Sequence, residues 1–318
     1  MPMRHIKASQ RGAALLMAML TVTLVASFAA SSLWLQWRAV EIESADRARM
    51  QSGWLLTGAL DWASLVLRED AMGQGADHLA EPWALPLQEV RLSSFLAQDR
   101  DNNAALTQGS LPEVFLSGRI EDMQSRLNLM NLVEGNAISE PDLKIFSKLF
   151  DLLGLPPGEL QTLSGKLVLA LNQASGQSAQ SAAPLRPQRL AQLQSMGLSQ
   201  TSMSRLEPFV TLLPLRTTLN LNTAPAEAIF SSVPGLSMEA AQRLVDARRL
   251  AYFRSLEEAH PLFGEFSAQV NLYHHGVSTR FFLLSGRLRS DAGVLEERSL
   301  IRRDAARTQT VWREKAAQ

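Results

Sequence analysis

The stretch RGAALLMAML, residues 11–20, opens the apolar segment that decides the fold. It follows a basic leader, residues 1–12, whose charged side chains are Arg4, Lys7 and Arg11. Residues 13–37 carry no charge and would form a helix of about 37 Å, enough to cross a hydrocarbon core of about 30 Å. The positive-inside rule keeps the leader in the cytoplasm. The sequence therefore predicts one membrane-spanning helix followed by a domain outside the cytoplasm.

Three interpretations of this segment remain open. A cleavable secretory signal has an apolar region of only about 7–15 residues, shorter than this one. A plain uncleaved anchor fits the length. The third interpretation rests on Gly12, because a glycine between a basic leader and an apolar helix resembles the site where a dedicated peptidase cuts bacterial type IV prepilins and pseudopilins. Cleavage between Gly12 and Ala13 would place Met17 at mature position five, where most of that superfamily carries Glu.

Composition excludes several classes of protein. The 318 residues include 31 basic and 31 acidic side chains and no cysteine. Zero net charge suggests no polyanionic partner, and the lack of cysteine excludes disulfides, thiolate metal sites and cysteine nucleophiles. The sequence contains no G-x-G-x-x-G, Walker A, H-E-x-x-H or G-x-S-x-G pattern. We therefore expect a protein that is not an enzyme.

Hydrophobic periodicity beyond the anchor predicts an α+β fold. Apolar residues at helical spacing extend the first helix to about residue 69. Residues 115–133 resemble a strand, a turn and a second strand. The segment 136–154 is typical of a helix with Ser139 as its N-cap and Gly154 as its stop. Residues 278–304 predict a hairpin around an Asp291–Gly293 turn.

These segments predict a small antiparallel sheet against the long helix, interrupted by a large all-α insertion. In chain order, the expected parts are the leader (1–12), the transmembrane part of the helix (13–37), the first part of the sheet frame (38–133), the inserted helical domain (134–275), the closing hairpin (276–304) and a frayed polar tail (305–318). A Ser/Gln/Ala-rich loop is expected at 173–187.

The segment 219–250 resembles a helix-hairpin-helix unit, which commonly binds DNA. Ser237 stands where the usual PGxG turn has its second glycine. The basic and acidic residues of the segment also cancel: Arg243, Arg248 and Arg249 face Glu227, Glu239 and Asp246. Because a DNA-binding surface should be basic, we favour a structural hairpin and expect no nucleic-acid partner. The alternative is a membrane-anchored DNA-binding protein of an uptake system.

Candidate metal ligands are sparse. Glu121 and Asp122 are adjacent acids in a predicted turn and form a possible weak cation site, although a solvated turn is favoured. From Leu160 to Leu206 the sequence has no Asp or Glu, so this stretch offers no side-chain carboxylate to calcium. The neighbouring His274 and His275 should point apart, as adjacent residues do, and should serve packing or surface roles.

Four features in order resemble the K-type minor pseudopilins of the bacterial type II secretion system. They are the QRG site followed by an apolar helix without Glu at mature position five, the segment GRIEDMQSRLNLMNLV, the segment LPLRTTLNLNTAPAEAIFSSVPGLS, and the long chain with its helical insertion. The match is imperfect, because Ser125 replaces a family glycine, Met130 lies between the two Asn residues, and Asn128 and Asn131 are offset by one.

The resemblance implies a pilin-like fold and a place at the tip of a secretion pseudopilus in the bacterial inner membrane, with the folded domain in the periplasm. The partners it implies are the I-type and J-type minor pseudopilins, other inner-membrane secretion components and prepilin peptidase. It also implies calcium, which is reported for the family. The family's acidic stretch is absent here, so we expect that site to be weakened or lost and predict no cofactor.

Overall fold

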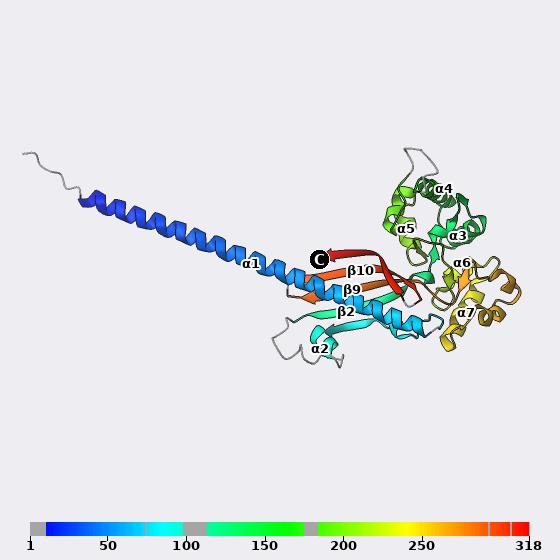
Figure 1. The fold of residues 1–318 in the computed structure, drawn as a ribbon. Helices are drawn as coiled ribbons and strands as arrows, with labels where there is room; N and C mark the ends of the chain where they lie inside the picture. Colours follow the sequence, from blue (N-terminus) through cyan, green and yellow to red (C-terminus); the bar gives the residue numbers. More distant parts are fainter. Residues whose placement is uncertain are drawn as a thin grey trace, which may run out of the picture. The chain divides into compact units, whose positions relative to one another are not determined.

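The computed structural model describes residues 11–73, 75–97, 113–174, 184–291, 293–305 and 307–317. The chain divides into two compact units, residues 1–55 and 56–318. One continuous helix, α1 (Arg11–Met72), supplies all of the described part of the first unit and the start of the second (Figure 1). The first helix was predicted over about 13–69, so its existence and length are confirmed.

A five-stranded antiparallel sheet forms the frame of the second unit, in the order β1-β2-β9-β10-β11. Its strands are β1 (Leu87–Arg91), β2 (Phe115–Asp122), β9 (Phe281–Ser290), β10 (Gly293–Asp304) and β11 (Arg307–Ala317). The central β9 pairs with β2 on one side and β10 on the other. The predicted closing hairpin is therefore correct, and its second strand joins the sheet beside a third.

The expectation of a frayed polar tail is wrong. Residues 307–317 form β11, which pairs along almost its whole length with β10. Polar side chains suit an edge strand, one face of which is solvated, so composition alone did not distinguish it from a loose terminus. Trp312 lies opposite Leu300 in the register and packs against that side of the sheet.

The α1 helix covers one face of the sheet. Leu60 and Leu67 pack against Phe282, Leu284 and Ile301. These strand residues share a face because side chains alternate along a strand. Gly286 continues this row at a point of close approach: a Cβ there would lie 2.8 Å from Cδ1 of Leu56. A larger residue at 286 would force the Leu56 side chain to move.

The helical insertion lies between β2 and β9. Its principal helices are α3 (Glu140–Leu152), α4 (Pro157–Ala174), α5 (Gln200–Leu206), α6 (Ala226–Ser232), α7 (Met238–Leu250) and α8 (Leu256–Ala259). The 3-10 segments η3 (Met123–Ser125), η4 (Leu129–Leu132), η5 (Leu190–Met196) and η6 (His260–Gln269) connect them. One apolar cluster, whose buried members run from Leu127 to Val270, forms its core.

Two details of the predicted insertion need correction. It begins directly after β2, at residue 123, because the apolar residues from Leu127 to Leu132 belong to the helical core and not to the sheet frame. It is also not entirely helical. Three two-stranded pairs tie its connections: β3 (Leu127–Asn128) with β6 (Val210–Thr211), β4 (Val133–Glu134) with β5 (Ala137–Ile138), and β7 (Leu219–Asn220) with β8 (His275–Gly276).

The predicted limits of α3 are confirmed. Ser139 is the N-cap, and Gly154, with φ +60°, lies directly beyond the helix in the left-handed region that glycine tolerates. Ser139 does not cap through the usual backbone bond; its Oγ donates to Oδ2 of Asp142 at 2.6 Å. Outside the frame and the insertion, the chain also forms η1 (Pro82–Ala84) and α2 (Leu92–Ala97).

Candidate functional site

The predicted processing site lies at the start of α1. The helix begins at Arg11, so the backbone of Gly12 and Ala13 belongs to its first turn. Met17 is exposed. Arg4 and Lys7 lie outside the described residues.

The described first unit presents apolar side chains to its surroundings. Leu16, Phe28 and Trp37 are each more than 60% exposed. The helix contains a stretch long and apolar enough to cross a membrane, and no part of that stretch is buried within the protein. A soluble helix normally buries such a surface, so this exposure fits a membrane anchor.

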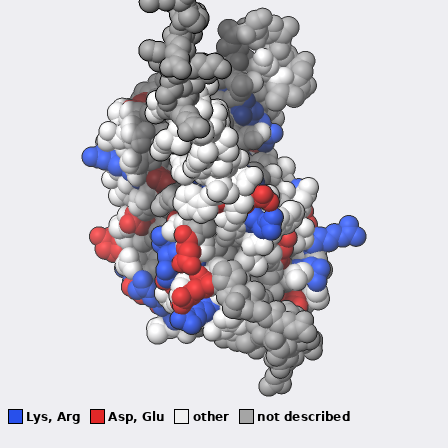
Figure 2. Space-filling view, turned by 90° about the vertical axis from the view of Figure 1, so that its left-hand side faces the viewer, with Lys and Arg blue, Asp and Glu red and all other residues white. Residues whose placement is uncertain are grey.

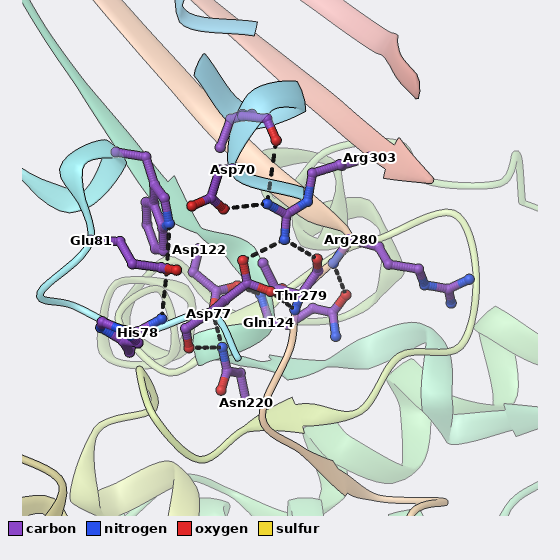
Figure 3. Close-up of polar contacts among 12 residues, drawn as sticks. Asp70, Asp77, His78, Glu81, Asp122, Gln124, Asn220, Thr279, Arg280 and Arg303 are labelled. Carbon is purple, nitrogen blue, oxygen red and sulfur yellow. Dashed lines mark hydrogen bonds and ion pairs between the residues drawn. The ribbon is translucent and has the colours of Figure 1, made fainter. Parts of the chain in front are cut away.

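In the second unit, a buried polar cluster joins the sheet to the insertion (Figure 3). We call it the junction cluster; it comprises Asp70, Asp77, Asp122, Asn220, Thr223, Thr279 and Arg303. Arg303, on β10, is its cation and is only 7% exposed. Its Nη1 lies 2.7 Å from Oδ2 of Asp70 at the end of α1, and its Nη2 donates to Oδ1 of Asp77 and to the carbonyl of Thr279. Arg303 thereby fastens α1, the segment after it and the return from the insertion.

Asp122, the last residue of β2, is the second centre of the junction cluster. Its carboxylate accepts from the backbone N–H of Gln124 at 2.7 Å, Oγ1 of Thr279 at 2.6 Å, Nδ2 of Asn220 at 2.9 Å and Oγ1 of Thr223 at 2.5 Å. Burial raises the pKa of this carboxyl, and the hydrogen bonds act in the opposite direction. Four donors leave its oxygens fully occupied.

The candidate cation site at Glu121 and Asp122 is therefore not assembled. The two residues are neighbours on a strand and point to opposite faces of the sheet. Glu121 forms ion pairs with Arg119 at 2.7 Å and Arg126 at 3.0 Å. Asp122 is buried, so the prediction of a solvated turn is wrong as well.

A different group of carboxylates comes close enough to hold a cation. Ligand atoms of Asp70, Asp77 and Glu81 lie within 4.8 Å of one another. The guanidinium of Arg303 already bridges the two aspartates, and Glu81 accepts from the N–H of His78 and from Nε1 of Trp83. The cationic charge that these oxygens need is thus supplied by the chain itself. Each of these three carboxylates thus has a partner within the chain.

Burial changes the protonation of Glu81. Desolvation raises its pKa to about 7, against the lowering effect of the hydrogen bonds from His78 and Trp83, while the neighbouring Asp70 raises it further. Glu81 therefore titrates near neutral pH.

Four asparagines of the two quoted family-like segments form hydrogen bonds to backbone groups where no strand pairing is present. Asn222 donates to the carbonyl of Phe253 and accepts from its N–H, both at 2.9 Å. Asn131 makes the same pair of bonds to Thr217: it donates to the carbonyl at 2.9 Å and accepts from the N–H at 3.2 Å. Asn128 bonds the backbone of residues 213 and 215, and Asn220 donates to the carbonyl of Asp77 and accepts from the N–H of Asn222. The Asn-rich motifs thus hold connections together, and sequence reasoning found the residues without their role.

The helix-hairpin-helix segment is formed by α6 and α7, as predicted, and Lys148 of α3 ties the carbonyls at its turn. Nζ of Lys148, on α3, donates to the carbonyls of Phe230 at 2.7 Å, Val233 at 2.9 Å and Leu236 at 3.0 Å. On the other side, the Phe266 ring lies against Gly235 so closely that a Cβ on the glycine would be 2.6 Å from Cε1 of the ring. Val233 and Leu236 of the turn are buried, whereas Pro234 and Gly235 are exposed.

Charge offers no support for nucleic-acid binding either. Arg248 donates inward to the carbonyl of Leu221, and Arg249 pairs with Asp246 at 3.2 Å. On the face drawn in Figure 2, basic and acidic side chains are interspersed instead of gathered by sign.

The two adjacent histidines have different polar partners, and their ring centroids lie 6.1 Å apart in an edge-to-face arrangement. His275 is buried, with Nε2 3.0 Å from Oγ of Ser232, and burial lowers its pKa to about 3. His274 lies beside Asp142, with 3.6 Å between Nε2 and Oδ1. Both serve packing.

Comparisons with known proteins agree with this architecture. Two models of the family described as type II secretion system protein K match residues 125–215 and 219–277. Protein K of the type II secretion system of Pseudomonas aeruginosa is 28% identical over 302 residues, covering 87% of this chain and 84% of that protein. A chain in the crystal structure of the GspK-GspI-GspJ complex from the enterotoxigenic Escherichia coli type 2 secretion system aligns with a TM-score of 0.61 at 17% identity, covering 85% of this chain and 98% of that one.

A long apolar helix followed by an antiparallel sheet, with a helical insertion between two of the strands, defines a pilin-like protein of the pseudopilin class. Both family models lie in the insertion and its borders, the part that sets this protein apart from a simple pilin-like frame. The chain belongs to the protein K family of the type II secretion system.

Proposed function

We propose that this protein is a minor pseudopilin at the tip of the type II secretion pseudopilus, where it initiates or caps assembly for protein export across the outer membrane. The observation that carries this proposal is the position of the insertion. It follows β2 and is fastened by the junction cluster at Asp70, where α1 ends. A stacked subunit beyond that end of the sheet would need the space that the insertion occupies, whereas a tip subunit has no neighbour there.

The partners in this proposal are the I-type and J-type minor pseudopilins. The protein from enterotoxigenic Escherichia coli, which shares the fold, was crystallised in a complex with both. The exposed apolar surface of α1 supports an anchor in the bacterial inner membrane, with the N-terminus in the cytoplasm and the second unit in the periplasm. Prepilin peptidase would process the leader between Gly12 and Ala13.

Met17 fits the same role. In ordinary subunits the Glu at this mature position is thought to pair with the N-terminal amine of a neighbour. A methionine thioether is only a weak acceptor and cannot supply a carboxylate. A tip subunit has no subunit above it to receive that contact, so the loss of the carboxylate costs the assembly nothing.

The proposed role requires neither catalysis nor a cofactor. The buried carboxylates of the junction cluster are bonded to the chain's own donors, which supports a structural use. A calcium titration of the full chain tests the second point. We expect no change in melting temperature, and a rise of several degrees would contradict it.

The main test is mass spectrometry of the protein extracted from membranes of cells that express the secretion system. Processing predicts a chain that begins at Ala13, whereas an intact Met1 would exclude the pseudopilin role. A Gly12→Val variant provides the matched control, because a branched residue at the cut should leave the leader attached. Co-purification of the I-type and J-type proteins with the processed chain then tests the partners.

A further inference from the structure

A cleft of about 640 Å³ opens in the second unit at the C-terminal end of α7, beside the segment that follows α1. Its walls include Leu79, Arg248, Leu250, Tyr252 and Arg254. This volume is in the range of sites that bind small molecules or short peptide segments. The cleft lies apart from the hairpin turn, which is at the other end of α7.

Arg248 places a partly buried cation in the cleft. One donor, Nη1, reaches the carbonyl of Leu221 at 2.5 Å, and within the described ranges no carboxylate pairs with its guanidinium. Burial, together with the nearby Arg249, lowers its pKa to about 10, so it keeps its charge at neutral pH. Charges removed from water are ordinarily paired, so this position favours a bound anion.

Two further arginines strengthen the positive charge. Arg254 forms no side-chain hydrogen bond or ion pair with any residue that the structure describes, and Arg249 has only an exposed contact with Asp246. Glu258 is the acid of the cleft wall, and its carboxylate accepts from the backbone N–H of Arg254 at 2.8 Å. The cleft wall holds three arginines and Glu258, and Asp246 beside it pairs with Arg249, so the cleft is still basic in a chain of zero net charge.

The rim of the cleft is apolar. Leu250 is 92% exposed, Leu79 is 55% exposed and Tyr252 is 40% exposed. The Tyr252 ring stacks on His78 with 3.7 Å between the ring centroids, which fixes one wall. A single exposed leucine needs no explanation, but apolar side chains grouped around an unpaired cation are a feature of binding surfaces.

We propose that this cleft binds an acidic peptide segment of a partner protein, with a carboxylate on Arg248 and Arg254 and an adjoining apolar side chain over Leu79 and Leu250. The positive charge favours the carboxylate, and the apolar rim favours carbon beside it. A nucleic acid suits the cleft less well, because its phosphates need an extended basic track and would meet Glu258 and Asp246. This binding site does not depend on the proposed position of the protein at the pseudopilus tip. It would be an additional property of the same chain.

The test measures fluorescence anisotropy with the full chain in detergent micelles. The probe is a fluorescein-labelled hexapeptide, Ser-Leu-Glu-Leu-Asp-Leu, amidated at its C-terminus. A matched peptide carries Gln and Asn in place of the two acids. We expect saturable binding of the acidic peptide that weakens as salt is raised, and binding of the neutral peptide weaker by about 10-fold or more.

Variants locate the site. Arg248→Gln should raise the Kd of the acidic peptide about 10-fold, and the exposed changes Arg254→Gln and Leu250→Ser should each raise it several-fold. Arg243→Gln is the control, because Arg243 is an exposed arginine of α7 outside the cleft. Should Arg248→Gln fail to fold, the two exposed variants still decide the outcome.

Three results would overturn the proposal. They are the absence of saturable binding by the acidic peptide, equal effects of the cleft variants and Arg243→Gln, and binding of a duplex DNA probe as tight as that of the peptide. Since the measurement uses the isolated chain, failure here leaves the tip role intact. Conversely, an unprocessed leader in cells would leave the peptide site intact.

Discussion

Arg303 on β10 donates a hydrogen bond to Asp77, a residue 226 positions earlier in the chain. Both side chains are almost fully buried. The pair closes the second unit, because Asp77 follows α1 and Arg303 precedes the last turn of the sheet. The N–H of Thr279, where the chain returns from the insertion, donates to the same aspartate at 2.6 Å. Together with the pair between Arg303 and Asp70, these bonds join the end of α1, the sheet and the return from the insertion.

Removing this cation should destabilise the fold strongly. Arg303→Met leaves Asp77 buried without its partner, and we expect the free energy of unfolding to fall by about 3–5 kcal/mol. Urea denaturation of the full chain in micelles measures it. Arg302→Met is the matched control on the same strand: its pair with Asp304 is partly exposed, so a loss of about 0–1 kcal/mol is expected. Equal losses in both variants would show that Arg303 has no special role.

Stability should decline as pH rises through the titration of Glu81. Burial raises its pKa from 4.5 to about 7 in the folded state, so between these values the folded protein holds more protons than the unfolded one. Stability is then highest below pH about 4.5 and falls up to pH about 7. Glu81→Gln should reduce this slope in thermal melts taken from pH 5 to 7.

The slope should not vanish in Glu81→Gln, since burial also raises the pKa of Asp122. Glu89→Gln is the control. A hydrogen bond from Arg289 lowers the pKa of Glu89, so its contribution is complete above pH about 4.5 and is lost only at lower pH. A Glu81→Gln profile identical to that of the unchanged protein would contradict the assignment.

Lys148 should stabilise the α6–α7 hairpin and should have no role in binding nucleic acid. Lys148→Met removes three hydrogen bonds to turn carbonyls, and we expect a loss of about 1–3 kcal/mol together with faster amide hydrogen exchange in residues 229–240. Lys144→Met, an exposed change on the same helix, should do neither.

The same chain should give no electrophoretic shift with duplex DNA at low salt. Salt-sensitive binding that is lost in Lys148→Met would overturn the structural interpretation of the hairpin.

The last strand should be required for stability. Glu297 is fully buried, and its counter-ions are Arg313 at 3.0 Å and Lys315 at 3.3 Å, both on β11. Deleting residues 307–318 leaves this carboxylate buried without its counter-ions. We expect this effect to lower the free energy of unfolding by about 3–5 kcal/mol. Denaturation of the truncated chain measures it.

Glu297→Gln in the truncated chain removes the unpaired buried charge and should recover part of the lost free energy of unfolding. In the full chain the same substitution should be destabilising, because it removes the buried counter-charge of Arg313 and Lys315 and leaves Arg313, among the described residues, only its exposed ion pair with Asp61. A truncated chain as stable as the full one would restore the frayed-tail interpretation.

The sequence predicted the elements whose signal is local. The extent of α1, the stop at Gly154, the α6–α7 hairpin and the turn between β9 and β10 follow from hydrophobic period and turn chemistry. The missed strand β11 has a mixed polar pattern, and its stability comes from pairing with β10. Its interactions are non-local, and no window of sequence contains them.

For the candidate site too, the sequence showed some of the residues but not the contacts that they make. The Asn motifs and the pair Glu121–Asp122 were recognisable as unusual, but a pattern does not show which atoms a side chain meets. Asp122 meets four donors from segments up to 157 residues away. Arg303 and Lys148 gave no signal, because basic residues on an amphipathic segment are ordinarily solvated.

The sequence by itself determined that the chain begins with a membrane-length apolar helix and continues as an α+β domain with a helical insertion. These properties depend on composition and on the order of neighbouring residues. Only the tertiary structure decided that Asp70 and Asp77 pair with Arg303, that Lys148 binds the carbonyls of the hairpin turn, and that three arginines meet exposed leucines in one cleft. Each of these requires charges or apolar groups from distant segments to come within a few ångströms, and only folding brings them together.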